Sequence, residues 1–281
     1  MTGPKKYCYL NGKIVPFSQA KVSVNDIGLT RGFGVSEFLR SDNGKIFLLN
    51  DHVRRFFKSA YMIGLKPSLS KESLGKAIQS VLKKNGGGNA QIRVIMTGGD
   101  TISGIEFDKK KPMLFILVEH FVPLSGTLYR NGGKLITYEY QRTIPEAKMT
   151  NYIAAVSLQK KKKKEKAVEI LFVHRGLVRE ASTSNIFMFK GSNLVTPYDG
   201  VLLGITRGFV LTLAKPVYHA EERNVRLEEL LSADEVFLTA TNKEILPIVR
   251  IDDHIIGNGK VGERTKHLMG LFREKTGSKV M

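Results

Sequence analysis

Cysteine and tryptophan are almost missing from this chain of 281 residues, which has no tryptophan and a single cysteine, Cys8. One cysteine can form no internal disulfide and cannot build a cysteine-based metal cluster, so no metal site is expected. No stretch reaches the ~18 consecutive apolar residues of a membrane-spanning helix, and the start of the sequence lacks the apolar region of a signal peptide. We therefore expect a cytoplasmic protein without a membrane partner.

Acidic residues are also scarce. The chain has 26 Asp and Glu but 44 Lys and Arg, which gives a formal net charge of +18. Clustered lysines and arginines attract phosphate backbones, which raises the question of nucleic-acid binding. Much of the excess, however, lies in short runs such as residues 160–164, which contain no aromatic residue. This run follows an apolar segment, and the pattern predicts a single helix over residues 152–166. A solvated helix surface is favoured over a specific nucleic-acid site. A non-catalytic, polyanion-binding protein is kept as the alternative.

The length suits two domains, and the apolar pattern predicts an α+β protein. Asn11-Gly12 and Asn43-Gly44 separate short apolar runs, which is the signal of antiparallel hairpins. Apolar residues at helical spacing then predict one helix capped by Asn50 or Asp51 and a second that starts at Ser70. A turn-rich segment without periodicity follows. These features predict a smaller N-terminal α/β domain at 1–121, a linker at 122–133 and a larger C-terminal domain at 134–281.

Residues 178–189 place Glu180 beside a run of small and hydroxylated residues, just before an apolar strand. A carboxylate at the mouth of a buried strand is costly unless a cation faces it, although the stretch alone could be a surface turn. Residues 204–206 and 240–241 offer backbone amides and a hydroxyl where a helix begins or a strand ends, which suits a phosphate. Pyridoxal phosphate would need, besides this, a lysine, a carboxylate and an apolar side chain over its ring.

Five short motifs, spread over nearly the whole chain, contain these candidate residues. They are Asn50-Asp-His52-Val-Arg-Arg55-Phe, Lys148-Met-Thr-Asn151-Tyr152, Glu180-Ala-Ser-Thr-Ser-Asn185-Ile-Phe, Leu202-Leu-Gly204-Ile-Thr206-Arg and Thr239-Ala-Thr241-Asn-Lys-Glu244-Ile-Leu-Pro247. In this order they resemble the class IV aminotransferases, the family of branched-chain aminotransferases, D-amino acid aminotransferases and aminodeoxychorismate lyases. The resemblance implies a two-domain, D-amino acid aminotransferase-like fold (fold type IV).

The resemblance also implies roles for particular residues. Lys148 matches the lysine that binds pyridoxal 5'-phosphate and moves the proton, and Glu180 matches the carboxylate that pairs with the ring nitrogen. The cofactor-binding set that it implies is Arg55, Lys148, Tyr152, Glu180, Leu202, Ile205, Thr206, Ala240 and Thr241. Helical periodicity alone does not separate Arg55 from Arg54 as the phosphate ligand. Tyr152 lies one residue closer to the lysine than the family's tyrosine.

Two further residues are candidates for contact with the substrate. Ser36 stands where the family commonly has an aromatic residue, in Gly32-Phe-Gly34-Val-Ser36-Glu37, so the side-chain pocket should be larger or differently shaped. Arg93 alternates with the apolar residues of its strand and should point away from the core. The sequence does not decide whether Arg93 contacts the substrate or bonds a neighbouring loop.

The sequence therefore predicts an enzyme that exchanges an amino group between an amino acid and a 2-oxo acid such as 2-oxoglutarate. The Asn151-Tyr152 pair favours branched-chain substrates. A D-amino acid aminotransferase or an aminodeoxychorismate lyase is the alternative within the family. The resemblance also implies a homodimer in which the partner subunit supplies part of the pocket.

Overall fold

The structure, a computed structural model, describes residues 6–277 and contains two compact units. The first comprises the chain up to Val122 together with Ala147–Asn151, and the second comprises Pro123–Glu146 and the chain from Tyr152 onward. Residues 123–133, expected as a linker, belong to the second unit and contain helix α4 (Gly126–Asn131). Ser125 caps this helix by accepting from the amide of Thr127. A helix of six residues is too short to reveal itself by periodicity, so its cap was the only local signal.

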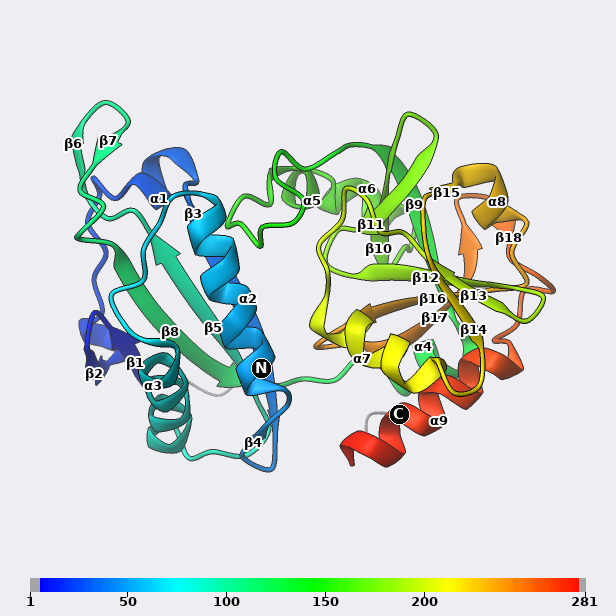
Figure 1. Cartoon of the computed structure of the whole chain (residues 1–281), viewed down its shortest axis with the longest axis horizontal. Coiled ribbons are helices and arrows are strands. Elements are labelled where there is room, and N and C mark those ends of the chain that lie inside the picture. The colour runs from blue at the N-terminus through cyan, green and yellow to red at the C-terminus, as the bar shows by residue number, and fades with distance from the viewer. Residues whose placement is uncertain (1–5, 278–281) are drawn as a thin grey trace. The chain divides into compact units, whose positions relative to one another are not determined.

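The first unit is an antiparallel sheet with the strand order β2-β1-β8-β5-β3-β4, against which helices α2 and α3 pack (Figure 1). Its elements are β1 (Tyr7–Leu10), β2 (Lys13–Pro16), η1 (Phe17–Gln19), α1 (Ile27–Arg31), β3 (Gly34–Asp42), β4 (Lys45–Ile46), α2 (Leu49–Met62), α3 (Lys71–Lys84), β5 (Ala90–Thr97), β6 (Thr101–Ser103), β7 (Glu106–Phe107) and β8 (Met113–His120). Strands β6 and β7 form a separate two-stranded ribbon. The buried side chains of the helices and the sheet share one core.

Local chemistry explains the elements of this unit. Asn11 and Gly12 have φ values of 41° and 97°, the positive values that a two-residue hairpin turn requires, and the predicted hairpin of β1 and β2 is confirmed. The predicted apolar stripe of α2 is buried at Val53 and Phe56. The helix begins at Leu49, one residue before the expected cap, because Leu48 already turns the chain in a left-handed conformation.

Strand β3 has two different faces, and this alternation positions the polar side chains. Val35, Glu37 and Leu39 are buried on the face that α2 covers, whereas Ser36 and Phe38 are half-buried on the other face. A glutamate thus occupies a position in the strand where an apolar residue would be usual, directly under a helix.

The second unit is built on a ten-stranded sheet with the order β14-β13-β12-β16-β17-β9-β10-β11-β15, in which β18 also pairs with β17. Its elements, besides α4, are β9 (Gly133–Glu139), α5 (Ile153–Ser157), α6 (Gln159–Lys164), β10 (Glu169–His174), β11 (Leu177–Ala181), β12 (Asn185–Lys190), β13 (Asn193–Thr196), α7 (Ile205–Ala214), β14 (His219–Glu222), β15 (Val225–Arg226), α8 (Leu227–Leu231), β16 (Glu235–Ala240), β17 (Glu244–Ile251), β18 (His254–Ile255) and α9 (Glu263–Thr276). Parallel pairs join β9 to β10 and to β17, and β13 to β14.

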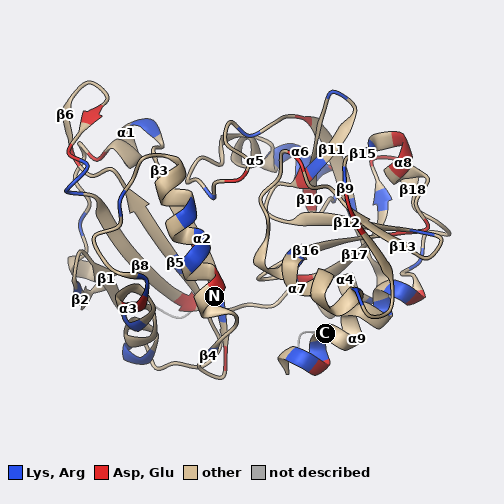
Figure 2. Ribbon diagram, viewed as in Figure 1, with Lys and Arg blue, Asp and Glu red and all other residues tan. Residues whose placement is uncertain are grey.

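The lysine run lies on α6, where no side chain is buried, and Figure 2 shows this helix as a basic segment. The single helix expected over residues 152–166 is wrong. The chain leaves helical geometry at Leu158 (φ −87°, ψ 3°), so that α5 and α6 are separate short helices.

None of the helices in residues 6–277 is both long and apolar enough to cross a membrane.

Candidate active site

Arg55 lies on the inner face of α2, where it pairs with the buried Glu37 of β3. Its Nε donates to Glu37 Oε2 at 3.0 Å and its Nη2 donates to Oε1 at 2.6 Å. His52, one turn earlier, places Nδ1 3.0 Å from the same Oε1 atom. Arg54 is solvent-exposed instead, with 63% of its side chain accessible and an ion pair to Asp51. The structure therefore separates the two arginines that helical periodicity could not.

The charges in this cluster are set by burial and by the neighbouring cations. Burial alone would raise the pKa of Glu37, but the positive charge of Arg55 and the bonds from Arg55 and His52 outweigh it and hold this pKa well below its usual value. Burial lowers the pKa of His52, and the charges of Arg55 and Lys148 lower it further, against the opposing effect of Glu37. Glu37 is thus ionised and His52 neutral, which leaves Arg55 firmly oriented.

Lys148 lies in the short segment of residues 147–151 that packs against β3 and α2. Its amide donates to Ser59 Oγ at 3.0 Å, and its carbonyl accepts from the amide of Ser36 at 2.8 Å. Met149 bridges to Val35. These contacts bring three predicted site residues of the first unit, Ser36, Arg55 and Lys148, onto neighbouring elements.

Arg93 lies on the half-buried face of the first sheet, as its alternation predicted. The register pairs Ser36 with Ile95 and Phe38 with Arg93, so Ser36 and Arg93 share this face. Arg93 forms an ion pair with Glu119 of the adjacent strand β8. The side chain thus bonds a neighbouring strand, rather than the neighbouring loop that the sequence had left open.

In the second unit, Glu180 of β11 is buried and both of its oxygens accept hydrogen bonds. Arg142 Nε donates to Oε1 at 2.6 Å, and the amide of Leu202 donates to Oε2 at 3.0 Å. Arg142 is the cation that a buried carboxylate requires. Sequence reasoning missed this arginine, because nothing within its own segment marks it as the partner of a residue 38 positions away.

Asn185 joins Leu202 to the two predicted phosphate-binding places. Its Nδ2 donates to the carbonyl of Leu202 at 2.7 Å, and in the register of β12 and β16 it lies opposite Thr239. A Cβ atom on Gly204 would come within 2.1 Å of Asn185 Oδ1, so any side chain at residue 204 would displace Asn185. The structure therefore brings together residues 202–206 and the end of β16, with Asn185 between them.

These two places have the properties of an anion site. Gly204 is the N-cap residue of α7, and no side chain caps the amides of the first turn, where Ile205 is half-buried and Thr206 is buried. Next to Ala240, the hydroxyl of Thr239 is buried without a hydrogen-bond partner among residues 6–277. Uncapped helix amides and an orphaned hydroxyl are the groups that a phosphate satisfies. The residues present therefore fit a cofactor with one phosphate.

The hydroxylated run after Glu180 binds a second buried carboxylate, that of Glu169. Ser184 Oγ and the amide of Thr183 donate to the buried carboxylate of Glu169, at 2.5 Å and 2.8 Å. Lys243 Nζ lies 2.6 Å from Glu169 Oε1. Since Lys243 follows the half-buried Thr241, this ion pair anchors the second phosphate-binding place to the turn of residues 182–184.

Tyr152 occupies the N-cap position of α5 in the second unit and is half-buried.

Within residues 6–277, no group of three or more His, Cys, Asp or Glu side chains is placed to hold a metal ion.

The first unit thus contains a buried, oriented arginine, and the second contains an uncapped helix start and a buried carboxylate. The family model described as amino-transferase class IV matches residues 34–251. The chain belongs to the class IV aminotransferase family. The expected family, its α+β fold and its pyridoxal phosphate-dependent aminotransferase chemistry are confirmed.

Several relatives resemble the chain over nearly its whole length. A putative branched-chain-amino-acid aminotransferase of Methanocaldococcus jannaschii is 36% identical over 277 residues, with 95% of each chain covered. A D-alanine aminotransferase of Bacillus licheniformis is 30% identical, with 92% of this chain and 93% of the relative covered. Among solved structures, a branched-chain amino acid aminotransferase of Escherichia coli has a TM-score of 0.90 at 27% identity, and the match covers 98% of this chain and 97% of the solved one.

Proposed function

We propose that this protein transfers the amino group of a branched-chain amino acid to a 2-oxo acid such as 2-oxoglutarate. The observation that carries the substrate class is the 36% identity to a putative branched-chain enzyme across 95% of both chains. The likeness to solved branched-chain aminotransferases supports it. A D-amino acid aminotransferase is the second candidate, because a D-alanine enzyme is 30% identical over a similar span.

The first unit would supply the reactive lysine and one phosphate ligand. Pyridoxal phosphate, when bound, supplies an electrophilic carbon and a ring that accepts electrons. Lys148 would bind the cofactor at this carbon and move the proton at the α carbon of the amino acid. Arg55 would bind the phosphate through its Nη1 atom, since Nε and Nη2 donate to Glu37. Ser36 and Arg93 line the substrate side.

The second unit would hold the ring and the rest of the phosphate. Glu180 would accept a hydrogen bond from the ring nitrogen and keep it protonated, and Arg142 orients this carboxylate. Leu202 would pack on the ring, and Tyr152 would contact its hydroxyl. Ile205, Thr206, Ala240 and Thr241 would bind the rest of the phosphate.

A panel of amino donors tests the substrate class. With 2-oxoglutarate as acceptor, we expect L-leucine, L-isoleucine and L-valine to give kcat/KM values at least about tenfold above that of D-alanine, because the wrong configuration leaves the side chain outside its pocket. Glutamate formation is the measurement. Faster turnover of D-alanine would favour the second candidate. An aromatic product from aminodeoxychorismate, without turnover of any amino donor, would contradict both.

Changing Glu37 to glutamine is expected to weaken the hold on the cofactor. Glutamine keeps the shape but removes the charge that orients Arg55, and hydrogen bonds to charged groups contribute about 1.5–3 kcal/mol, or roughly tenfold to hundredfold in the dissociation constant of the cofactor. Equilibrium binding of pyridoxal phosphate to the cofactor-stripped enzyme measures this. Arg54→Gln, which removes an exposed arginine of the same helix, is the matched control and should bind normally.

Binding of pyridoxal, which has no phosphate group, shows whether Glu37→Gln acts through the orientation of Arg55 or through general damage to the binding site. If Glu37→Gln weakens pyridoxal and pyridoxal phosphate equally, Glu37 does not act through the phosphate. Thermal unfolding of the stripped variant shows whether the unit is still folded.

We also propose that the protein is a homodimer of the cytoplasm. The family resemblance supports the dimer, and the single buried cysteine, Cys8, agrees with a reducing compartment. Light scattering of the purified protein and fractionation of cells test the two statements.

A further inference from the structure

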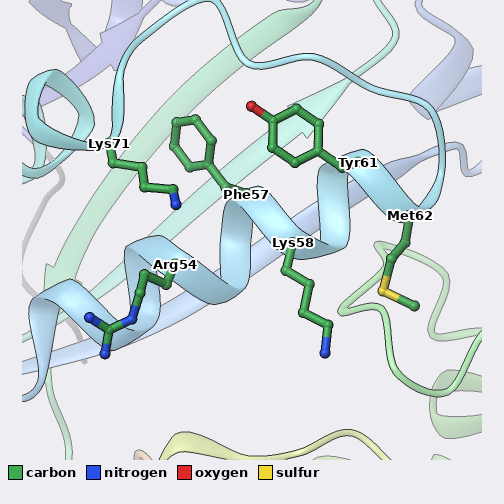
Figure 3. Close-up of a pocket in the computed structure, with 6 residues that line it drawn as sticks. All are labelled: Arg54, Phe57, Lys58, Tyr61, Met62 and Lys71. Atoms are coloured by element: carbon green, nitrogen blue, oxygen red, sulfur yellow. The ribbon is translucent and has the colours of Figure 1, made fainter.

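The outer face of α2 carries a cavity of about 480 Å³. Figure 3 shows its lining, which comes from α2 except for one lysine at the start of α3: Arg54, Phe57, Lys58, Tyr61, Met62 and Lys71. Arg55, whose side chain is 11% exposed and is held against Glu37, is not among these lining residues. Neither Glu37 nor His52 lines the cavity.

Aromatic and thioether groups form the apolar part of this cavity. Tyr61 is 56% exposed and Met62 is 40% exposed, on a helix whose other large apolar side chains are mostly buried. Phe57 is buried behind them, and its ring meets that of Tyr61 edge to face at a centroid distance of 6.1 Å. An exposed aromatic ring backed by a buried one offers a firm surface for a flat ligand.

The charges around this surface are positive and only partly compensated. Arg54 and Lys58 lie one helical turn apart, an arrangement in which like charges destabilise a helix. Lys71 lies in the first turn of α3, where the helix dipole also disfavours a cation, and its Nζ is 5.9 Å from the centre of the Phe57 ring. Arg54 pairs with Asp51, but no ion pair within residues 6–277 joins Lys58 or Lys71. A negatively charged ligand would relieve this repulsion.

We propose that this cavity is a second binding site of the protein, for a small planar aromatic anion. The ring of the ligand packs on Tyr61 and Met62, and its anionic group faces Lys58 and Lys71. A neutral aromatic molecule would leave the lysines uncompensated, whereas a small inorganic anion would leave the apolar surface exposed. Because the cavity lies within the first unit and uses none of the residues assigned to transamination, this site does not depend on the proposed reaction.

Phenyl phosphate is a suitable probe, used with the cofactor-loaded enzyme so that the phosphate site of the cofactor is already filled. Calorimetric titration should show one site, with inorganic phosphate and benzyl alcohol each binding at least about tenfold more weakly, since each lacks one half of the interaction. If inorganic phosphate binds as tightly as phenyl phosphate, the aromatic ring makes no contribution and the proposal is wrong. If benzyl alcohol binds as tightly as phenyl phosphate, the anionic group makes no contribution and the proposal is equally wrong.

Three variants and one control place the ligand in the cavity. Lys58→Gln, Lys71→Gln and Tyr61→Ala should each weaken phenyl phosphate by about threefold to tenfold, the scale of one exposed charge or one stacked ring. Lys76→Gln removes an exposed lysine of α3 that pairs with Glu72 outside the cavity, and it should bind as the parent does. An equal loss in Lys76→Gln, or no loss in both lysine variants of the cavity, would refute the site. Leucine transamination by each variant confirms that the protein is folded.

Discussion

Lys148→Ala is expected to abolish transamination, with a loss of about 10⁴-fold or more, because both covalent attachment of the cofactor and proton transfer at the α carbon depend on this amine. The fold should survive the change. Two of the contacts at this position are made by the backbone, through its amide to Ser59 and its carbonyl to Ser36, and alanine keeps both. Turnover of leucine with 2-oxoglutarate measures the loss, and thermal unfolding measures the fold.

Two additions make the Lys148 experiment decisive. Lys76→Ala, which removes an exposed lysine on α3, should retain full activity. A small external amine should restore part of the activity of Lys148→Ala, since it can take over the transfer of the proton. Activity of Lys148→Ala near that of the parent enzyme, without any added amine, would assign the chemistry to another residue.

Glu180→Gln is expected to lower kcat by about 10²–10³-fold, the scale of losing one charged group that stabilises a transition state. Glutamine fills the same space and can still accept from the amide of Leu202, but it cannot keep the ring nitrogen of the cofactor protonated. The cofactor should therefore remain bound, as its visible absorption would show, while the rate falls.

Arg142→Gln changes the partner of Glu180 and keeps the carboxyl group itself. This variant removes the arginine that donates to the Oε1 atom of Glu180, so we expect a smaller loss, about tenfold, which Glu180→Gln should mask in the double variant. Glu139→Gln, which changes a carboxylate paired with His174 in the same unit, is the control for loss of a negative charge. Unchanged kinetics in Glu180→Gln would contradict the role of Glu180 at the ring nitrogen.

Features that depend on neighbouring residues could be predicted from the sequence. The hairpin at Asn11-Gly12, the apolar stripe of α2 and the cap of α3 at Ser70 follow from turn and helix chemistry, and the structure contains all three. The five motifs likewise identified the family, because each keeps its residues together in the chain.

Features that depend on distant partners were not predicted. The ion pairs of Glu180 with Arg142 and of Glu169 with Lys243 join residues that no local pattern connects. Glu37 gave one usable signal, since its place between Val35 and Leu39 puts it on the buried side of an alternating strand, where a carboxylate needs a partner. The sequence did not identify Arg55 as that partner, because the pair forms only where α2 packs on the strand.

The cluster of Glu37, His52 and Arg55 has a consequence for how the protein responds to acidity. Since the pKa values of Glu37 and His52 both lie below their ordinary values, each group gains a proton only at a lower pH than an exposed residue of its type. The charge next to Arg55 is therefore less sensitive to acid than it would be with an exposed histidine and glutamate in these positions.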